Sequence, residues 1–456
     1  MPFKLSVSIV LTTVILLACV VRFVGLEISP PGFFYDEATG AAHSLCYQQT
    51  GADLFAKRGI FSQVDFSGFQ SAPFVIGGAL WTSVFGIDVT GFRSFVAFAG
   101  VMSVLGVYVL ARMLSPDRHY ALWAAALAAC LPWAFQFSRI SWDAPLGVTF
   151  LVWGLALAYR RSVTDKASMP DLLIWGTAGV LLTLASYTYS PLRIQALLMV
   201  LLLPHIRWLP RATILLVFAL GNIAVLQYYQ DPAFAHRAQL LALTSDDPSN
   251  PFRDASIPGL LMAYFSEMAS HFSLPFLLGP GDQNLRHSIQ SHGVLDLVSF
   301  FGLLVGAVLA LATLLDFRRV TPAQLSIASI GLLGILAGVT PSALTWDSTP
   351  HALRAIGAWP FVAMLAAFGL TSILRAKESQ LAASALLALL FGVYLQSYFV
   401  KYPPIAQWWF DAEFVEQIRS TDTFPDHYQP VVRAYYRMAQ LGESCAAVRT
   451  SMGVKP

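Results

Sequence analysis

The chain has 456 residues, of which 56% are hydrophobic and only 12% are charged, and its formal net charge is +2. The charged share is about half that of an ordinary soluble domain, which excludes a soluble globular protein. The small net charge gives no reason to expect a nucleic-acid partner. Apolar runs long enough to cross a bilayer recur along most of the sequence, so it predicts an all-α integral membrane protein.

Eleven apolar segments have about the length that a transmembrane helix needs. They are residues 5–24, 92–113, 120–137, 144–159, 172–187, 192–205, 212–228, 294–315, 323–339, 355–374 and 381–400. The first could also be a signal peptide, but no small-residue cleavage site precedes Pro30-Pro31, so we predict a retained span. The shorter apolar piece 73–85 is predicted to form a re-entrant or juxtamembrane helix in the first outer loop.

Lys and Arg residues identify the cytoplasmic side, because short loops on that face are enriched in them. They gather at residues 4, 112–118, 160–166, 207–211, 318–319 and 375–377. Eleven spans put all these groups on one side and the N-terminus in the cytoplasm. The hydrophilic segments left outside are residues 25–91, 230–293, 341–354 and 401–456. We expect a transmembrane domain over 1–400, a short helical extracytoplasmic tail over 401–456, and a bacterial inner-membrane location.

Two adjacent carboxylates, Asp36 and Glu37, follow the first span in an aromatic setting. A carboxylate in partly apolar surroundings holds its proton more tightly and can act as a general base near neutral pH. An inverting sugar transfer needs one such base, which takes a proton from the acceptor as it attacks the anomeric carbon. The alternative is that one of the pair only caps the helix that begins near Ala38.

The run from Arg22 through Pro30-Pro31 to Asp36-Glu37-Ala38 resembles the first-loop signature of GT-C glycosyltransferases of the protein O-mannosyltransferase and lipid A aminoarabinose transferase type. Further motifs in matching order are Ser71-Ala72-Pro73, Phe85-Gly86, Arg93-Ser94, Phe137-Ser138-Arg139, Tyr187-Thr188-Tyr189-Ser190-Pro191, Gly281-Asp282-Gln283-Asn284-Leu285-Arg286-His287 and Pro350-His351-Ala352-Leu353-Arg354. Together they cover most of residues 22–374. At residues 70–73 the protein O-mannosyltransferases carry a His-Pro-Pro-Leu-like motif that this chain lacks, so we do not expect protein mannosylation.

The resemblance implies a GT-C fold, a polyprenyl-phosphate sugar as donor, Asp36 as the catalytic base, and Glu37 as a residue that positions a neighbour or the acceptor. The donor's phosphate predicts cations at the outer membrane boundary, where arginine can pair with phosphate through two parallel hydrogen bonds. The candidates are Arg93, Arg139, Arg193, Arg286, His287, His351 and Arg354. Each arginine could instead extend only to the lipid headgroups.

A divalent-metal site could in principle be assembled from oxygen and nitrogen ligands. The residues that could supply them are Asp36, Glu37, Asp282, His287 and His292. No compact ligand motif supports such a site, and arginines alone can offset the phosphate charge. We therefore predict no cofactor and do not favour a metal.

Cys46 and Cys445 lie outside the apolar runs, so a disulfide between them is conceivable. We predict instead that both thiols are unpaired. The aromatic residues of segments 394–399 and 408–410 are predicted to form an interfacial belt rather than a sugar-stacking surface.

These features predict a membrane glycosyltransferase that moves a sugar from a polyprenyl-phosphate carrier to a glycan, lipid or protein acceptor on the extracytoplasmic face. The carrier enters sideways from the membrane lipids, and its sugar lies beside Asp36. One alternative is a polysaccharide ligase or polymerase acting on lipid-linked glycans, although such proteins rely on an arginine-rich loop late in the chain. The other is a transporter or flippase, although we find no internal repeat typical of that class.

Overall fold

The structure is a computed structural model that describes residues 7–58, 71–160, 168–202, 204, 206–228, 238–421 and 430–454. Lys4, Gln70, Arg161 and Lys166 lie outside the described residues. The described part of the chain is helical, and one isolated bridge joins Ala242 and Thr345. The helices are α1 (Val7–Phe23), α2 (Tyr35–Thr50), α3 (Ala72–Phe85), α4 (Val89–Leu114), α5 (Arg118–Cys130), α6 (Pro132–Phe137), α7 (Asp143–Ala158), α8 (Met169–Thr188), α9 (Ser190–Leu202), α10 (Trp208–Tyr228), α12 (Ile257–Ser270), α13 (Leu274–Leu277), α14 (Leu297–Leu315), α15 (Pro322–Ala343), η1 (Ile356–Ala358), α16 (Trp359–Ile373), α17 (Lys377–Gln396), η2 (Ser397–Lys401), α18 (Tyr402–Ala406), η3 (Trp408–Phe410), α19 (Ala412–Thr421), α20 (Pro430–Ala439) and α21 (Cys445–Ser451).

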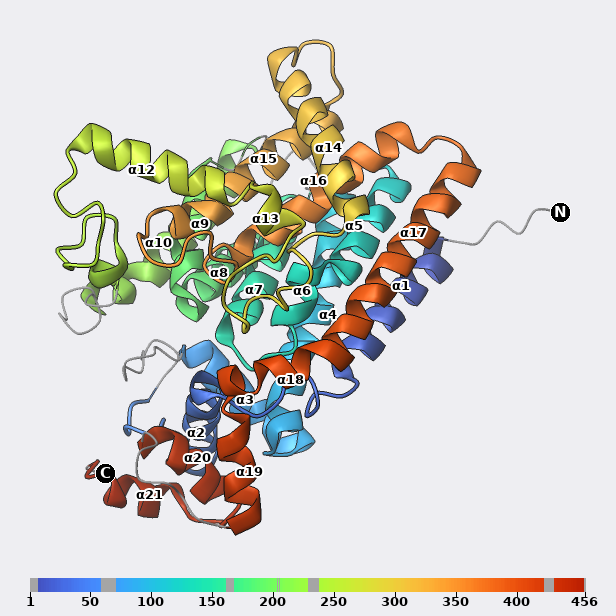
Figure 1. Cartoon of the computed structure of the whole chain (residues 1–456). Coiled ribbons are helices and arrows are strands. Elements are labelled where there is room, and N and C mark those ends of the chain that lie inside the picture. The colour runs from blue at the N-terminus through green and yellow to red at the C-terminus, as the bar shows by residue number, and fades with distance from the viewer. Residues whose placement is uncertain are drawn as a thin grey trace.

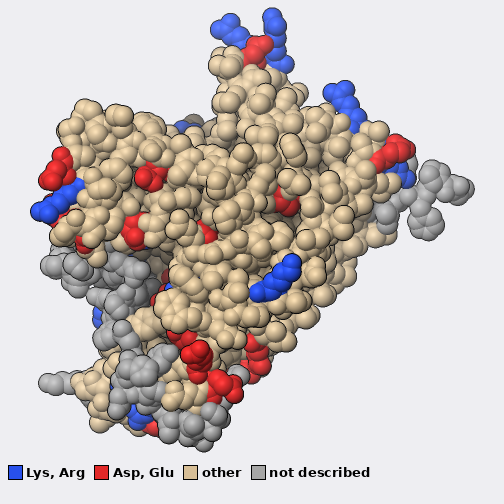
Figure 2. All heavy atoms as spheres, in the orientation of Figure 1, with Lys and Arg blue, Asp and Glu red and all other residues tan. Residues whose placement is uncertain are grey.

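Six helical segments in the described residues are long and apolar enough to cross a membrane. They are α4, α8, α14, α15, η1 with α16, and the continuous run from α17 through α18. Shorter apolar helices accompany them, namely α1, α3, α7, α9 and Trp208–Ala224 of α10. Figure 2 shows a broad surface that few charged side chains interrupt. The prediction of an all-helical integral membrane protein is confirmed, and the count of eleven spans stays a prediction.

The predicted span 120–137 is not one helix but two, α5 and α6. Leu131 between them has extended backbone angles, with φ −62° and ψ 122°, and Pro132 opens α6. Proline lacks an N–H donor and disfavours helical angles at the residue before it. The chain therefore leaves α5 at this point, and Trp133 N–H donates to Val294 O at 3.2 Å in the connection before α14.

The bundle interior depends on close backbone approach between α14 and α16, which pack together along their lengths. A Cβ on Gly306 would overlap the carbonyl of Leu365, and one on Gly369 would overlap the carbonyl of Gly302. Small residues spaced four apart let membrane helices approach closely, where van der Waals packing drives association. Larger side chains at these glycines would force the two helices apart.

At one end of the bundle, α2 and α3 lie beside the C-terminal helices α19, α20 and α21 (Figure 1). Helix α2 packs against α3, α20 and α21. Its buried Leu45 belongs to the same apolar cluster as Val431 and Tyr435 of α20. The first loop and the tail therefore form a common core.

The prediction that Cys46 and Cys445 are unpaired is wrong, because the structure joins them in a disulfide with Cα atoms 5.1 Å apart. The physical reason is the packing of the tail on α2, which brings together two residues separated by 399 positions in the sequence. Nothing in the local sequence around either cysteine signals so distant a partner.

The aromatic belt is only partly as predicted. Trp408 is 75% exposed, but Tyr394 and Tyr398 are buried. Their rings surround Phe135 of α6, with centroids at 5.7 and 5.0 Å. These tyrosines face the bundle interior because α17 and η2 pack against α6 there, so they are not available to the lipid interface.

Candidate active site

A cavity of about 530 Å³ lies where the first turn of α2 and the N-terminal end of α7 meet the loops around α8, α9 and α15. Its apolar wall includes Ile194, Leu243 and Leu344. Its charged and ionisable lining residues are Asp36, Asp143, Arg193, His351 and Arg354. Carboxylates and cations therefore face one apolar hollow, as a site for an amphipathic ligand requires.

Asp36 reaches this cavity from the first turn of α2. Phe34 occupies the N-cap position, so neither Asp36 nor Glu37 is the N-cap residue considered as an alternative. Asp411, which follows η3, fixes the start of the helix, because its Oδ2 accepts from Tyr35 N–H at 3.1 Å. Trp142 Nε1–H donates to Asp36 Oδ2 at 3.3 Å. The carboxylate is thus oriented by the residue before α7 and faces the cavity.

Glu37 points away from the cavity into the protein. It is fully buried, and its two oxygens accept from Arg93 at 2.9 Å (Nε to Oε1) and 2.7 Å (Nη2 to Oε2). Its Oε1 also accepts from Ser141 N–H at 2.7 Å. The carboxylate therefore ties α2 to α4 and to the connection that leads to α7, on which Trp142 lies.

Arg93 and Arg139 are fully buried and are not among the described residues that line the cavity. Besides Glu37, Arg93 donates to the carbonyls of Leu26, Pro30 and Gly32. Each of its five N–H groups has a protein acceptor. This arrangement positions the first loop and does not support the phosphate-binding role predicted for Arg93.

Arg139 is engaged in the same way. Its five N–H groups donate to the carbonyls of Val21, Arg22, Gly25 and Ser29. The ring of Phe399 lies 4.8 Å from its guanidinium carbon. Arg139 therefore caps the end of α1 and the turn after it, and its geometry does not support phosphate binding either.

Arg354 does line the cavity. Its Nη1 donates to Thr345 Oγ1 at 3.0 Å and to Asp347 O at 2.6 Å, and its Nη2 lies 3.4 Å from Asp347 Oδ2. Arg193 lines the same cavity, and its Nε donates to Ser186 O at 2.8 Å. These hydrogen bonds hold both guanidiniums in place in the lining of the cavity.

His351 also lines the cavity, whereas Arg286 and His287 are not among its lining residues in the described chain. Burial lowers the pKa of His351 well below its ordinary value, and the nearby His287, Arg354 and His271 act in the same direction. The ring is therefore neutral at neutral pH and can offer a phosphate only a neutral hydrogen bond. His287 lies behind it, with ring centroids 4.5 Å apart.

Arg286 lies near Asp36 but outside the cavity lining. Its guanidinium is stacked over the rings of Phe34 and Trp409, at 4.5 and 5.4 Å from their centroids. Burial lowers its pKa, while the charges of Asp36 and Asp411 act to raise it. Arg286 thus supplies positive charge near Asp36 without lining the cavity.

Asp143 is a cavity residue that the sequence analysis missed. It opens α7, lines the cavity with Asp36, and interacts electrostatically with that carboxylate. The available signal was an acidic residue at the end of an apolar helix, because ionisable groups at membrane depth are costly and usually functional. Asp36 therefore belongs to a pair of carboxylates from distant segments.

The helical arrangement defines the class of fold: the chain has the fold of GT-C glycosyltransferases over most of its length. The oligosaccharyltransferase of Archaeoglobus fulgidus, tethered with an acceptor peptide, matches with a TM-score of 0.55 at 14% identity, over 92% of this chain and 58% of that chain. The oligosaccharyltransferase AglB from Archaeoglobus fulgidus, in complex with an inhibitory peptide and a dolichol-phosphate, matches with a TM-score of 0.52 at 16% identity, over 91% of this chain and 58% of that chain.

ArnT from Cupriavidus metallidurans bound to undecaprenyl phosphate matches with a TM-score of 0.46 at 15% identity, over 97% of this chain and 77% of that chain. No protein-family model and no curated protein sequence matches the chain at a significant level. The chain spans less than two thirds of the length of the archaeal enzyme. At these identities the structural matches show the fold.

Proposed function

We propose that the protein is a membrane glycosyltransferase that transfers a hexose or pentose from a polyprenyl-phosphate carrier to an acceptor hydroxyl, with inversion at the anomeric carbon. One observation carries this proposal: Asp36 faces the same apolar cavity as Arg193 and Arg354. A base and two phosphate-pairing cations around an apolar hollow are what this transfer needs.

In the proposed reaction, the carrier phosphate pairs with Arg354 and Arg193, and its prenyl chain lies along the apolar wall. The acceptor oxygen attacks the anomeric carbon while Asp36 takes the hydroxyl proton. The bond between that carbon and the phosphate oxygen breaks, and the polyprenyl phosphate leaves with the electron pair. Phosphate is already a good leaving group, so no strong general acid is required.

The proposed topology has eleven spans, a cytoplasmic N-terminus, and both the cavity and the tail on the extracytoplasmic face. The disulfide between Cys46 and Cys445 supports this orientation, because disulfides persist in oxidising compartments and are rare in the cytosol. Residues 1–400 form the membrane enzyme in this proposal, and residues 401–456 form its extracytoplasmic cap.

The lipid-phosphate donor is supported by a structural neighbour. The archaeal oligosaccharyltransferase that shares this fold has been solved with a dolichol-phosphate. That enzyme was also solved with peptides, but this chain spans only 58% of it, so the proposal leaves the acceptor as a glycan, lipid or protein.

The test compares the wild type with Asp36→Asn in lipid nanodiscs, using undecaprenyl phosphate that carries a labelled sugar and an extract of membrane lipids and glycans as acceptor. Release of undecaprenyl phosphate with transfer of label is the readout. A lost general base lowers turnover by about 10²–10⁴-fold. Asp316→Asn is the matched control, because the Asp316 side chain is 55% exposed in the loop after α14.

Wild-type turnover in Asp36→Asn would remove the proposed role of this residue. Transfer of a whole glycan chain instead of one sugar would favour a ligase or polymerase. Movement of the intact donor across sealed vesicles, with no glycosidic bond broken, would favour a transporter.

A further inference from the structure

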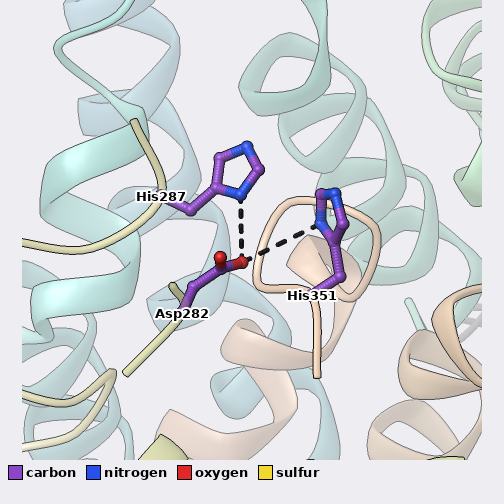
Figure 3. Close-up of side chains that lie close together, drawn as sticks. All are labelled: Asp282, His287 and His351. Carbon is purple, nitrogen blue, oxygen red and sulfur yellow. Dashed lines mark hydrogen bonds and ion pairs between the residues drawn. The ribbon is translucent and has the colours of Figure 1, made fainter. Parts of the chain in front are cut away.

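Three buried side chains from two outer connections lie close together (Figure 3), and one of them, His351, also lines the cavity. Asp282 and His287 belong to the connection between α13 and α14, and His351 belongs to the connection between α15 and η1. Each can offer one ligand atom, and these atoms all lie within 4.8 Å of one another. The exposed fractions are 3% for Asp282, 6% for His287 and 8% for His351.

The hydrogen bonds show where the lone pairs point. His351 Nδ1 accepts from the backbone N–H of Arg354 at 3.2 Å, so Nδ1 carries an electron pair and no proton. Asp282 Oδ2 lies 4.0 Å from that nitrogen, which is too far for a direct hydrogen bond. The single lone pair of Nδ1 is taken up by Arg354 N–H, so an ion bound through Nδ1 would replace that hydrogen bond.

That distance is close to the one a metal ion needs. Zinc binds carboxylate oxygen and imidazole nitrogen at about 2.0–2.2 Å in tetrahedral geometry, which places two ligand atoms about 3.4 Å apart, so the 4.0 Å between Asp282 Oδ2 and His351 Nδ1 must shorten when an ion binds. His287 Nδ1 lies 3.0 Å from the same oxygen, close enough to be the third ligand. Binding through it would displace the proton that His287 shares with Asp282.

The three side chains are held in place by neighbours, as metal ligands usually are. Asp282 Oδ1 accepts from Asn284 N–H at 2.8 Å, and Oδ2 accepts from Ala352 N–H at 2.7 Å. The His287 ring packs against Phe137 and Trp142, with centroids at 5.8 and 5.6 Å. To bind an ion with the other two side chains, the His351 ring must turn from Arg354 N–H towards Asp282.

We propose that Asp282, His287 and His351 form a binding site for one divalent transition-metal ion, with zinc as the best fit. Two imidazoles and one carboxylate suit zinc and its neighbours, whereas magnesium and calcium prefer a larger set of oxygen ligands. The ion would join the two connections at the cavity wall and fix the backbone that carries Arg354. This inference is independent of the proposed sugar transfer.

The experiment uses the full-length chain without an affinity tag, purified in detergent. The protein is dialysed with a chelator and then equilibrated with Zn²⁺ or Co²⁺ alone. Metal content is measured by mass spectrometry, and thermal unfolding is followed with and without Zn²⁺. We expect one ion per wild-type chain, an increase in Tm with Zn²⁺, and Co²⁺ absorption bands typical of nitrogen and oxygen ligands.

Asp282→Asn and His287→Gln should each weaken Zn²⁺ binding by more than about tenfold, since even supporting residues of metal sites cost that much. His292→Gln is the matched control, because His292 lies in the same connection but outside the three-residue cluster. It should bind like the wild type. The idea is overturned if the wild type takes up no ion, or if both ligand variants bind as tightly as the control. If those variants do not fold, absence of Co²⁺ bands in the wild type overturns it.

Discussion

Glu37 and Arg93 form a fully buried ion pair in which both carboxylate oxygens accept from the guanidinium, at 2.9 and 2.7 Å. Glu37 is the sequence neighbour of Asp36, which faces the cavity. Two adjacent carboxylates thus have different surroundings, because successive residues of a helix point about 100° apart. The pair fixes the first turn of α2, and that turn sets the direction of Asp36.

We expect Glu37→Gln to destabilise the protein by about 3–5 kcal/mol, because it leaves the Arg93 charge buried without its counter-ion. Thermal unfolding in detergent measures the change. In a double-mutant cycle with Arg93→Gln, the second substitution should cost much less than it does alone. Glu443→Gln is the control, because its pair with Arg437 is partly exposed and should contribute no more than about 1 kcal/mol. If Glu37→Gln and Glu443→Gln lowered stability equally, the buried pair of Glu37 and Arg93 would not have the stabilising role assigned to it.

Arg354 allows the proposed donor site to be tested apart from Asp36. Lysine cannot form the two parallel hydrogen bonds that arginine makes with phosphate, so Arg354→Lys should raise KM for a labelled undecaprenyl-phosphate sugar. One charged hydrogen bond contributes about 1.5–3 kcal/mol, or about 10–150-fold in KM, with a smaller change in kcat. Arg318→Lys, at the far end of α14, should behave as the wild type. An unchanged KM in Arg354→Lys would exclude contact with the donor phosphate.

The sequence alone could predict the helices and single out Asp36, which the structure places in the cavity lining, because apolar run length and an acidic residue in an aromatic segment are local signals. It could not separate Arg93 and Arg139 from Arg354. All three are arginines near span ends, and only the tertiary contacts show that the first two have their N–H groups taken by protein acceptors. Asp143 was missed for a related reason, since its pairing with Asp36 depends on how α7 meets α2.

The disulfide between Cys46 and Cys445 links α2 to the last helix, so its removal should loosen the tail from the first loop. Cys46→Ser should lower stability by about 2–4 kcal/mol, measured as a fall in Tm. Both cysteines are fully buried, so in the purified wild type a maleimide should label Cys46 and Cys445 only after the protein is both unfolded and reduced. Cys19→Ser is the control, because Cys19 is a free cysteine within α1. Labelling of Cys46 and Cys445 in the unfolded wild type without reductant would mean that the bond is absent.

His43, on the buried face of α2, packs against the segment that follows this helix, and we expect it to make stability depend on pH. The side chain is fully buried, and its Nδ1 accepts from Leu54 N–H at 3.3 Å. Burial lowers its pKa from 6.5 to about 3, and the charges of Lys57 and Arg449 add to the effect. Between these two values the unfolded chain binds a proton that the folded chain does not, so stability must fall as the pH falls from 6.5 towards 3.

Below pH 6.5 the free energy of unfolding should fall by up to about 1.4 kcal/mol per pH unit. This fall is measured as the difference in Tm slope between the wild type and His43→Gln from pH 7.5 to 5. Asp53 changes the slope in the opposite direction, because burial raises its pKa. Its effect is the same in the wild type and in the variant, so comparing the two isolates the contribution of His43. His119 lies exposed in the first turn of α5, so His119→Gln should keep the wild-type slope. Parallel slopes for the wild type and His43→Gln would show that His43 can take up its proton without disturbing its packing against Leu54 and Phe55.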